Sequence, residues 1–208
     1  MDKILQGKAV AVLIDTEYIS REVEHYKEFF PALGARVDFL SLLWGKNQKK
    51  IICDITNADD PVSQVHTMVV DKDVGNFNPN DYAIVIVAAN YVSCRLREIP
   101  PMGNFGSIEE LPTPPAVKFF ADAMKNKKIV KGALCHALWL LTPVPELLKG
   151  RKVICHTVVL ADIHNAGAVF TPDPSGVVID DDLVTGRSSA ELEDYANALL
   201  AVYKKINQ

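Results

Sequence analysis

The sequence contains no apolar run long enough to cross a bilayer and no secretory signal peptide in its first residues, Met1 to Gln6. A membrane-spanning helix needs about 20 consecutive apolar residues, and a signal peptide needs a basic segment followed by an apolar one. We therefore expect a cytoplasmic protein with no membrane partner.

Long runs of positive charge are also missing. The 22 lysines and arginines are outnumbered by 26 aspartates and glutamates, and the net charge is −4. Two short basic stretches, at residues 46–50 and 125–128, are typical of solvated loop and helix ends. Because nucleic-acid binding needs a basic surface, this balance predicts no nucleic-acid partner.

Cysteines are few and scattered. Cys53, Cys94, Cys135 and Cys155 form no CxxC pair and no cysteine–histidine cluster with the spacing of zinc ligands. We therefore expect free thiols and neither a metal nor another cofactor. Cys53 and Cys155 lie in apolar stretches, where a cysteine acts as a small core residue.

The composition that is present is typical of a globular α/β domain. Of the 208 residues, 49% are hydrophobic and 23% are charged, which suffices for a sizeable core. We predict one domain over residues 1–208, without internal repeats. The segment from Ile99 to Pro115 is rich in proline and glycine and has no apolar period, so we predict a loop insertion near residues 99–115.

Apolar patterning predicts alternating strands and helices. Runs at residues 8–14, 82–89 and 129–134 are typical of strands buried on both faces of a parallel sheet. Further expected strands are residues 35–40, 50–56, 65–70, 152–155, 168–170, 177–179 and 183–185. Expected helices are residues 21–33 with Ser20 as N-cap, 116–126, 136–148 with Pro143 and Pro145 as candidate break points, a turn at 160–165, and a last helix from Ser188 or Ser189 to Tyr203.

This order predicts an α/β fold: a doubly wound, flavodoxin-like, mostly parallel sheet with helices on both faces. Active sites of such sheets lie at the carboxyl ends of the strands. Both residues 15–22 and Cys135 follow predicted strands, so we expect them at that edge.

Cys135 stands where an apolar strand is expected to turn into a helix. A nucleophile at such a turn is lifted out of the sheet, and a helix N-terminus favours the thiolate. A lone cysteine would otherwise be interpreted as a core residue. The adjacent His136 could polarise the thiol, bind substrate or pack structurally, and the sequence leaves these three roles open.

The chain resembles the ThiJ/PfpI family, in the superfamily of the Parkinsonism-associated deglycase and of class I glutamine amidotransferase-like folds. The resemblance covers nearly the whole chain. It rests on residues 132–141 followed by 148–153, on residues 165–168, and on residues 178–187, in that order and spacing.

The resemblance implies partners for Cys135. The family has a glutamate about a dozen residues before the glycine that ends the first helix, which here is Glu22 before Gly34. That carboxyl group hydrogen-bonds the reactive cysteine in the family and could move its proton. Glu17 is the runner-up, and without the resemblance Glu22 would be interpreted as an ordinary helix acid. Backbone N–H groups near Asn90 and Ala137 are the candidates for holding an oxyanion.

The sequence departs from the family at three places around this site. Ala88-Ala89-Asn90 replaces Pro-Gly-Gly, whose backbone lines an anion pocket, and Ala137 replaces the glycine after Cys-His. Cys94 stands where the protease-like branch has a glutamate that reaches a neighbouring subunit. A triad shared between subunits is therefore not predicted.

Two functions follow as hypotheses. The first is a cysteine-dependent hydrolase or lyase that acts on a small carbonyl or amide substrate, with glyoxalase-, deglycase- or amidase-like activity. The alternative is a non-catalytic oxidative-stress sensor or chaperone-like protein in which Cys135 is a redox thiol. The resemblance also implies a homo-oligomer, with a dimer favoured. His156 receives little weight, and Asp162 with His164 is interpreted as a solvated surface pair.

Overall fold

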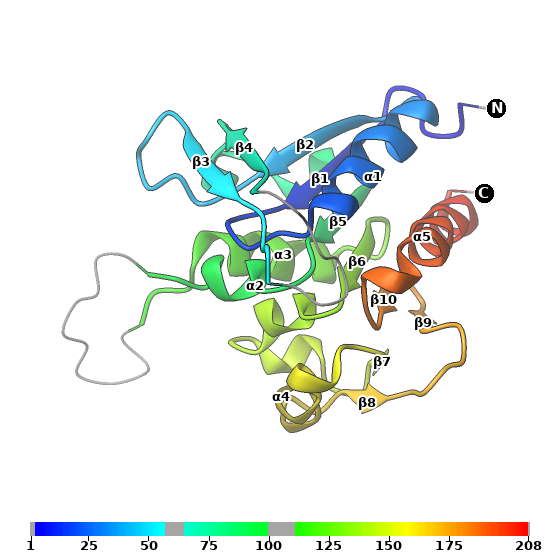
Figure 1. Cartoon of the computed structure of the whole chain (residues 1–208). Helices are drawn as coiled ribbons and strands as arrows, with labels where there is room; N and C mark the ends of the chain where they lie inside the picture. The colour runs from blue at the N-terminus through cyan, green and yellow to red at the C-terminus, as the bar shows by residue number, and fades with distance from the viewer. Residues whose placement is uncertain (1–2, 57–64, 100–110, 208) are drawn as a thin grey trace.

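A six-stranded sheet forms the centre of the computed structural model, which describes residues 3–56, 65–99 and 111–207. Its strand order is β2-β1-β5-β6-β10-β9, as Figure 1 shows. All neighbours pair in parallel except β9 with β10. The strands are β1 (Ala9–Leu13), β2 (Arg36–Leu40), β5 (Ile84–Val87), β6 (Val130–Leu134), β9 (Val177–Asp180) and β10 (Leu183–Gly186). The predicted mostly parallel, flavodoxin-like sheet is confirmed.

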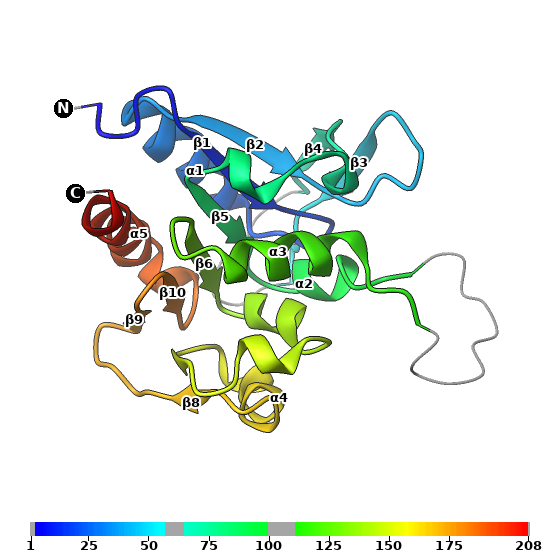
Figure 2. The same ribbon diagram turned by 180° about the vertical axis from the view of Figure 1, so that it is seen from behind.

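Helices cover both faces of this sheet. Helices α1 (Ser20–Ala32) and α5 (Leu192–Ile206) lie on one face, while α3 (Pro115–Lys125) and the short α2 (Val92–Arg95) lie on the other (Figures 1 and 2). The three longer helices match the predicted ones to within a few residues at most ends. They bury apolar residues at helical spacing, and the contacts of α1 are with β2 and those of α5 with β6, β9 and β10. Strands β1, β5 and β6 are buried throughout, and Lys131 is the charged residue among them.

The predicted cap of the first helix is wrong. Ile19, not Ser20, is the N-cap residue of α1, and it makes no side-chain capping bond. The Ser20 hydroxyl instead lies 3.0 Å from Nδ1 of His66, the residue directly before strand β4 (Thr67–Val70). A tertiary hydrogen bond has therefore replaced the local cap that the sequence suggested.

A small antiparallel pair follows β2, as predicted for this β-rich part of the chain. It consists of β3 (Lys49–Ile52) and β4 (Thr67–Val70). Lys49 reaches back to the buried Asp15 at the end of β1, with Nζ 2.6 and 2.7 Å from the two carboxylate oxygens. Residues 57–64, between the two strands expected at 50–56 and 65–70, lie outside the described residues, as do residues 100–110 of the expected insertion.

The helix predicted over residues 136–148 is not an α-helix. The structure has two 3₁₀ turns instead, at Ala137–Leu141 and Pro145–Leu147. Pro143 and Pro145 have no backbone N–H, so the i→i−4 bonds that would continue a helix cannot form there. Beyond them lie α4 (Leu160–Asn165) and the two-stranded parallel pair of β7 (Lys152–Val153) and β8 (Val169–Phe170).

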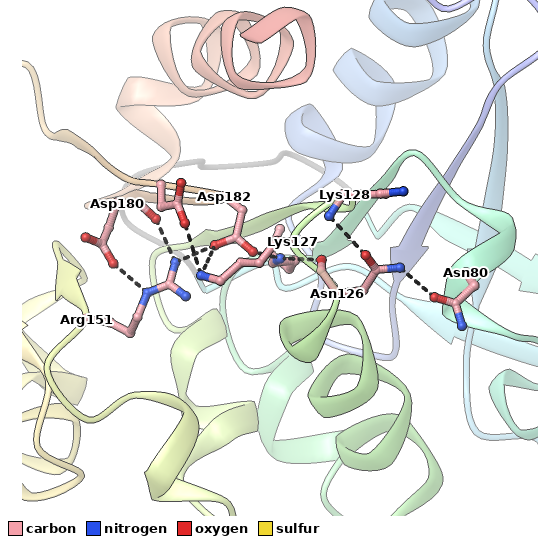
Figure 3. A network of polar contacts seen from close by, with 9 residues as sticks. Asn80, Asn126, Lys127, Lys128, Arg151, Asp180 and Asp182 are labelled. Atoms are coloured by element: carbon pink, nitrogen blue, oxygen red, sulfur yellow. Dashed lines mark hydrogen bonds and ion pairs between the residues drawn. The ribbon is translucent and has the colours of Figure 1, made fainter. Parts of the chain in front are cut away.

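A buried ion-pair network joins β6 to the turn before β10. The Lys131 side chain is fully buried and forms an ion pair with Asp182, which also accepts hydrogen bonds from Arg151 at 2.9 Å and Lys127 at 3.2 Å (Figure 3). Burial lowers the pKa of Lys131 to about 8. A buried charge is costly unless it is paired, so the stability of the fold depends on the pairing of Lys131 with Asp182.

No helix in the described ranges is long and apolar enough to cross a membrane.

Candidate active site

Cys135 comes directly after β6, at the carboxyl edge of the sheet. Its φ angle is +61°, in the left-handed region that residues other than glycine rarely adopt, at a cost of about 1–3 kcal/mol. Its N–H donates to the Gly186 carbonyl at 2.8 Å, and its own carbonyl accepts from the His156 N–H at 3.1 Å. These two bonds to neighbouring segments hold the strained backbone in place, as at a nucleophile elbow.

The thiol is less accessible than expected. Cys135 is only 3% exposed, whereas the elbow pattern predicted a side chain lifted into solvent. The turn that follows is a short 3₁₀ segment, so the expected support from an α-helix N-terminus is missing. Side chains from neighbouring segments therefore dominate the surroundings of the thiol.

His136 contacts the thiol directly. Its Nδ1 lies 2.8 Å from Sγ of Cys135, while its carbonyl accepts from the Ser93 hydroxyl at 3.1 Å. Of the three roles that the sequence left open for His136, this geometry favours polarising the thiol.

An aromatic cluster surrounds the His136 ring. His156 stacks on it with ring centroids 4.7 Å apart, and Tyr91 and Trp139 lie at 5.1 and 5.4 Å. Nδ1 of His156 accepts the Val158 N–H at 3.2 Å, so in the neutral ring the proton is on Nε2. Sequence reasoning gave His156 little weight, because Thr157 and not His156 stands where some relatives of the family have a site histidine. The fold nevertheless brings the His156 ring onto His136.

Glu22 is fully buried at the same edge. Its Oε1 accepts from the Tyr26 hydroxyl at 2.8 Å, and the Ala89 N–H lies 2.9 Å from Oε2. Ala89 stands two residues beyond Val87, which pairs with Ala133, so Ala89 is level with Cys135 on the neighbouring strand. Burial and the Glu22 carboxylate raise the pKa of Tyr26 well above its ordinary value, which keeps this hydroxyl a donor.

Asn90 adopts the positive φ that a glycine would take, +66°. Its side-chain amide donates to the Glu17 carbonyl at 2.9 Å and to the Asp54 carboxylate at 2.8 Å. The amide thus connects the site to two loops, through Glu17 and Asp54. Glu17, the runner-up to Glu22, has both carboxylate oxygens bound by Arg95, at 2.9 and 3.1 Å.

Ala137, the other predicted oxyanion position, is buried at the first residue of the 3₁₀ turn. The first N–H groups of a helical turn have no partner within that turn. The Ala137 N–H is therefore positioned at the open end of the turn, two residues after Cys135.

The other cysteines have different surroundings. Burial raises the pKa of Cys155 to about 12 and also raises the pKa of Cys94, while the Cys53 sulfur accepts the His66 N–H at 3.1 Å. High pKa values make Cys94 and Cys155 poor nucleophiles near neutral pH. Within the described ranges, no three His, Cys, Asp or Glu side chains converge as metal ligands.

The flavodoxin-like sheet and the strained cysteine at its carboxyl edge define an α/β protein of the nucleophile-elbow class. The family model of the DJ-1/PfpI family matches residues 101–202. This match spans just under half of the chain, includes Cys135, and agrees with the resemblance that the sequence motifs carry.

Relatives and solved structures are similar to this chain over most of its length. An uncharacterized protein of Staphylococcus haemolyticus is 24% identical over 188 residues, which cover 90% of this chain and 93% of that protein. A ThiJ/PfpI domain protein of Brachyspira murdochii has a TM-score of 0.73 at 12% identity, covering 96% and 98% of the two chains.

Two further structures have the same fold. DJ-1beta of Drosophila melanogaster has a TM-score of 0.69 at 13% identity, covering 96% and 95% of the two chains. A protein of Anabaena variabilis with DJ-1/ThiJ/PfpI-like and ferritin-like domains has a TM-score of 0.73 at 20% identity over 93% of this chain. This chain spans 47% of that two-domain protein.

Proposed function

We propose that this protein is a cysteine-dependent hydrolase or lyase that acts on a small carbonyl or amide substrate, with glyoxalase-, deglycase- or amidase-like chemistry. One observation carries the proposal: the thiol of Cys135, on a strained backbone, lies 2.8 Å from Nδ1 of His136. An imidazole at hydrogen-bond distance stabilises the thiolate, which is the nucleophilic form of cysteine.

A 2-oxoaldehyde illustrates the chemistry. The Cys135 thiolate adds to the aldehyde carbon, a C–S bond forms, and the carbonyl electron pair moves to oxygen. Backbone N–H groups at Ala137 and near Asn90 stabilise that oxyanion. Glu22 moves the former aldehyde hydrogen, as a proton, from the first carbon to the second. The oxygen on the second carbon takes the proton that the thiol had given to His136, which produces a thioester of a 2-hydroxy acid. Water then hydrolyses the thioester and releases the 2-hydroxy acid and the thiol.

Burial of the site supports a small substrate. A thiol that is 3% exposed admits a short aldehyde or amide more readily than a folded polypeptide. Cys94 also occupies the position where the protease-like branch has its glutamate. We therefore do not propose proteolysis.

The same burial supports one alternative, a peroxide-sensing thiol. Hydrogen peroxide is small enough to enter a confined site. The thiolate attacks one peroxide oxygen and hydroxide leaves, which produces a sulfenic acid, and a second equivalent produces the sulfinate. Selective oxygen addition at Cys135 after mild peroxide, together with no turnover of any carbonyl or amide tested, would favour this function.

The decisive experiment compares Cys135→Ser with the wild type in methylglyoxal conversion. We expect turnover by the wild type and none by the variant, because a serine hydroxyl in this setting is not ionised. Cys155→Ser is the matched control, since Cys155 is equally buried but has a raised pKa. Equal activity of wild type and Cys135→Ser would refute the proposal.

A further inference from the structure

A cavity of 480 Å³ lies beside the elbow, between α2, the Ala137–Leu141 turn and α4. Its volume is within the range of small-molecule sites, about 300–1,000 Å³. Trp139 and Pro145 line it, as do Arg97 and Asp162, while Cys135 is not among its lining residues. The cavity is thus separate from the thiol site.

Two oppositely charged side chains, those of Arg97 and Asp162, line this cavity, and both form a hydrogen bond with Trp139. Nη1 of Arg97 donates to the Trp139 carbonyl at 3.3 Å, and the Asp162 carboxylate accepts from the indole Nε1 at 2.7 Å. Neither Arg97 nor Asp162 has an ion-pair partner within 4.0 Å in the part of the chain that the structure describes. The two charges are therefore held in place without neutralising each other.

Such a cavity fits a ligand that carries both charges. A guanidinium binds a carboxylate through two parallel hydrogen bonds, and a carboxylate binds an ammonium group. A ligand with one charge would leave the opposite protein charge uncompensated. The indole ring, Pro145 and Ala166 supply an apolar wall for a side chain, and the cavity is large enough for one of moderate size.

We infer that this cavity binds a free α-amino acid as a zwitterion, with its carboxylate on Arg97 and its ammonium group on Asp162. This binding site is additional to the proposed cysteine chemistry and does not depend on it. An unbranched apolar side chain such as that of methionine adapts well to an irregular wall, so methionine is a suitable probe.

Isothermal titration calorimetry with three ligands tests the inference. L-methionine has both charges, L-methioninamide lacks the carboxylate, and N-acetyl-L-methionine lacks the ammonium group. For the wild type we expect L-methionine to bind at least about tenfold more tightly than either blocked form. Failure of L-methionine to bind at millimolar concentrations, or equal affinity for all three, would overturn the inference.

Variants assign each charge to its residue. Arg97→Gln should bind L-methionine and L-methioninamide alike, and Asp162→Asn should bind L-methionine and N-acetyl-L-methionine alike. Arg97→Lys keeps a positive charge and should retain part of the preference for the carboxylate, which guards against a folding defect in Arg97→Gln. Retention of the full preference by Arg97→Gln would contradict the assignment.

Matched controls remove charges elsewhere. Lys125 and Asp181 are exposed and do not line the cavity, so Lys125→Gln and Asp181→Asn should bind like the wild type. Cys135→Ser should also bind L-methionine with unchanged affinity. Loss of carbonyl turnover and loss of amino-acid binding are therefore separable results.

Discussion

The imidazole of His136 and the thiol of Cys135 meet at 2.8 Å although the two residues are adjacent in the chain. Successive side chains in a strand point to opposite faces. The φ angle of +61° at Cys135 ends that alternation and lets both side chains face the same space. The backbone strain at Cys135 thus creates the contact that the proposed chemistry needs.

Replacing His136 by phenylalanine should slow alkylation of Cys135 by iodoacetamide near neutral pH by about tenfold, because the neighbouring imidazole that favours the thiolate is removed. Phenylalanine keeps the ring stack with His156. Peptide mass spectrometry against time measures the rate at Cys135 alone. His164→Phe, at an exposed position of α4, is the control. An unchanged alkylation rate of Cys135 in His136→Phe would contradict the proposed role of His136 in favouring the thiolate.

Glu22→Gln should lower kcat for a 2-oxoaldehyde by about a hundredfold, since proton transfer by a positioned carboxylate contributes on that order. KM should change little, because Glu22 moves a proton rather than holding the substrate. Steady-state kinetics separates the two parameters. Glu24→Gln removes an exposed acid of the same helix that pairs with Lys27, and it should leave kcat unchanged. A wild-type kcat in Glu22→Gln would exclude the proton role of Glu22.

Gly132→Ala should destabilise the fold by about 1–3 kcal/mol, as overpacking in a core does. A Cβ at Gly132 would lie 2.2 Å from the Tyr195 hydroxyl oxygen, whereas one at Gly75 would meet nothing closer than 3.4 Å. Urea denaturation should show the loss for Gly132→Ala and little change for Gly75→Ala. Adding Tyr195→Phe to Gly132→Ala removes the clashing oxygen and should restore part of the lost stability. If the double variant is no more stable than Gly132→Ala, the Tyr195 hydroxyl is not the cause of the loss.

Acid should destabilise the protein through Asp182. Burial opposes ionisation of this carboxyl, but hydrogen bonds and charges from Lys131, Arg151 and Lys127 outweigh burial and lower its pKa. The unfolded chain therefore binds a proton at higher pH than the folded one, so this contribution to stability is present above about pH 4 and is lost as the pH falls through the folded-state pKa.

Asp182→Asn should remove that part of the acid dependence and lower stability at neutral pH by about 3–5 kcal/mol, because Lys131 loses its buried partner. Urea denaturation at several pH values measures both effects. Asp181→Asn, a neighbouring exposed acid, should keep the wild-type pH dependence. A parallel pH profile for Asp182→Asn and wild type would show that Asp182 does not cause it.

Much of the sheet was predictable because its signals are local. The largely apolar runs of β1, β5 and β6 favoured strands buried on both faces, and Gly34, at φ +91°, ends the first helix as expected. Local signals failed where tertiary contacts competed with them. Ser20 bonds His66 instead of capping its helix. The break after Leu141 has a different origin, because Pro143 and Pro145 are themselves local signals that end a helix.

The sequence by itself determined the resemblance to a family, the order of strands and helices, and the position of Cys135 at the end of a strand. These features depend on patterns within a few residues of one another and on motifs at constant spacing. Only the tertiary structure decided the surroundings of the Cys135 thiol. These are its burial, the stacking of His156 on His136, and the hydrogen bond from the Ala89 N–H that holds Glu22 level with Cys135. The physical reason is that these contacts join residues on different strands, and a parallel sheet brings strand ends together whatever their separation along the chain.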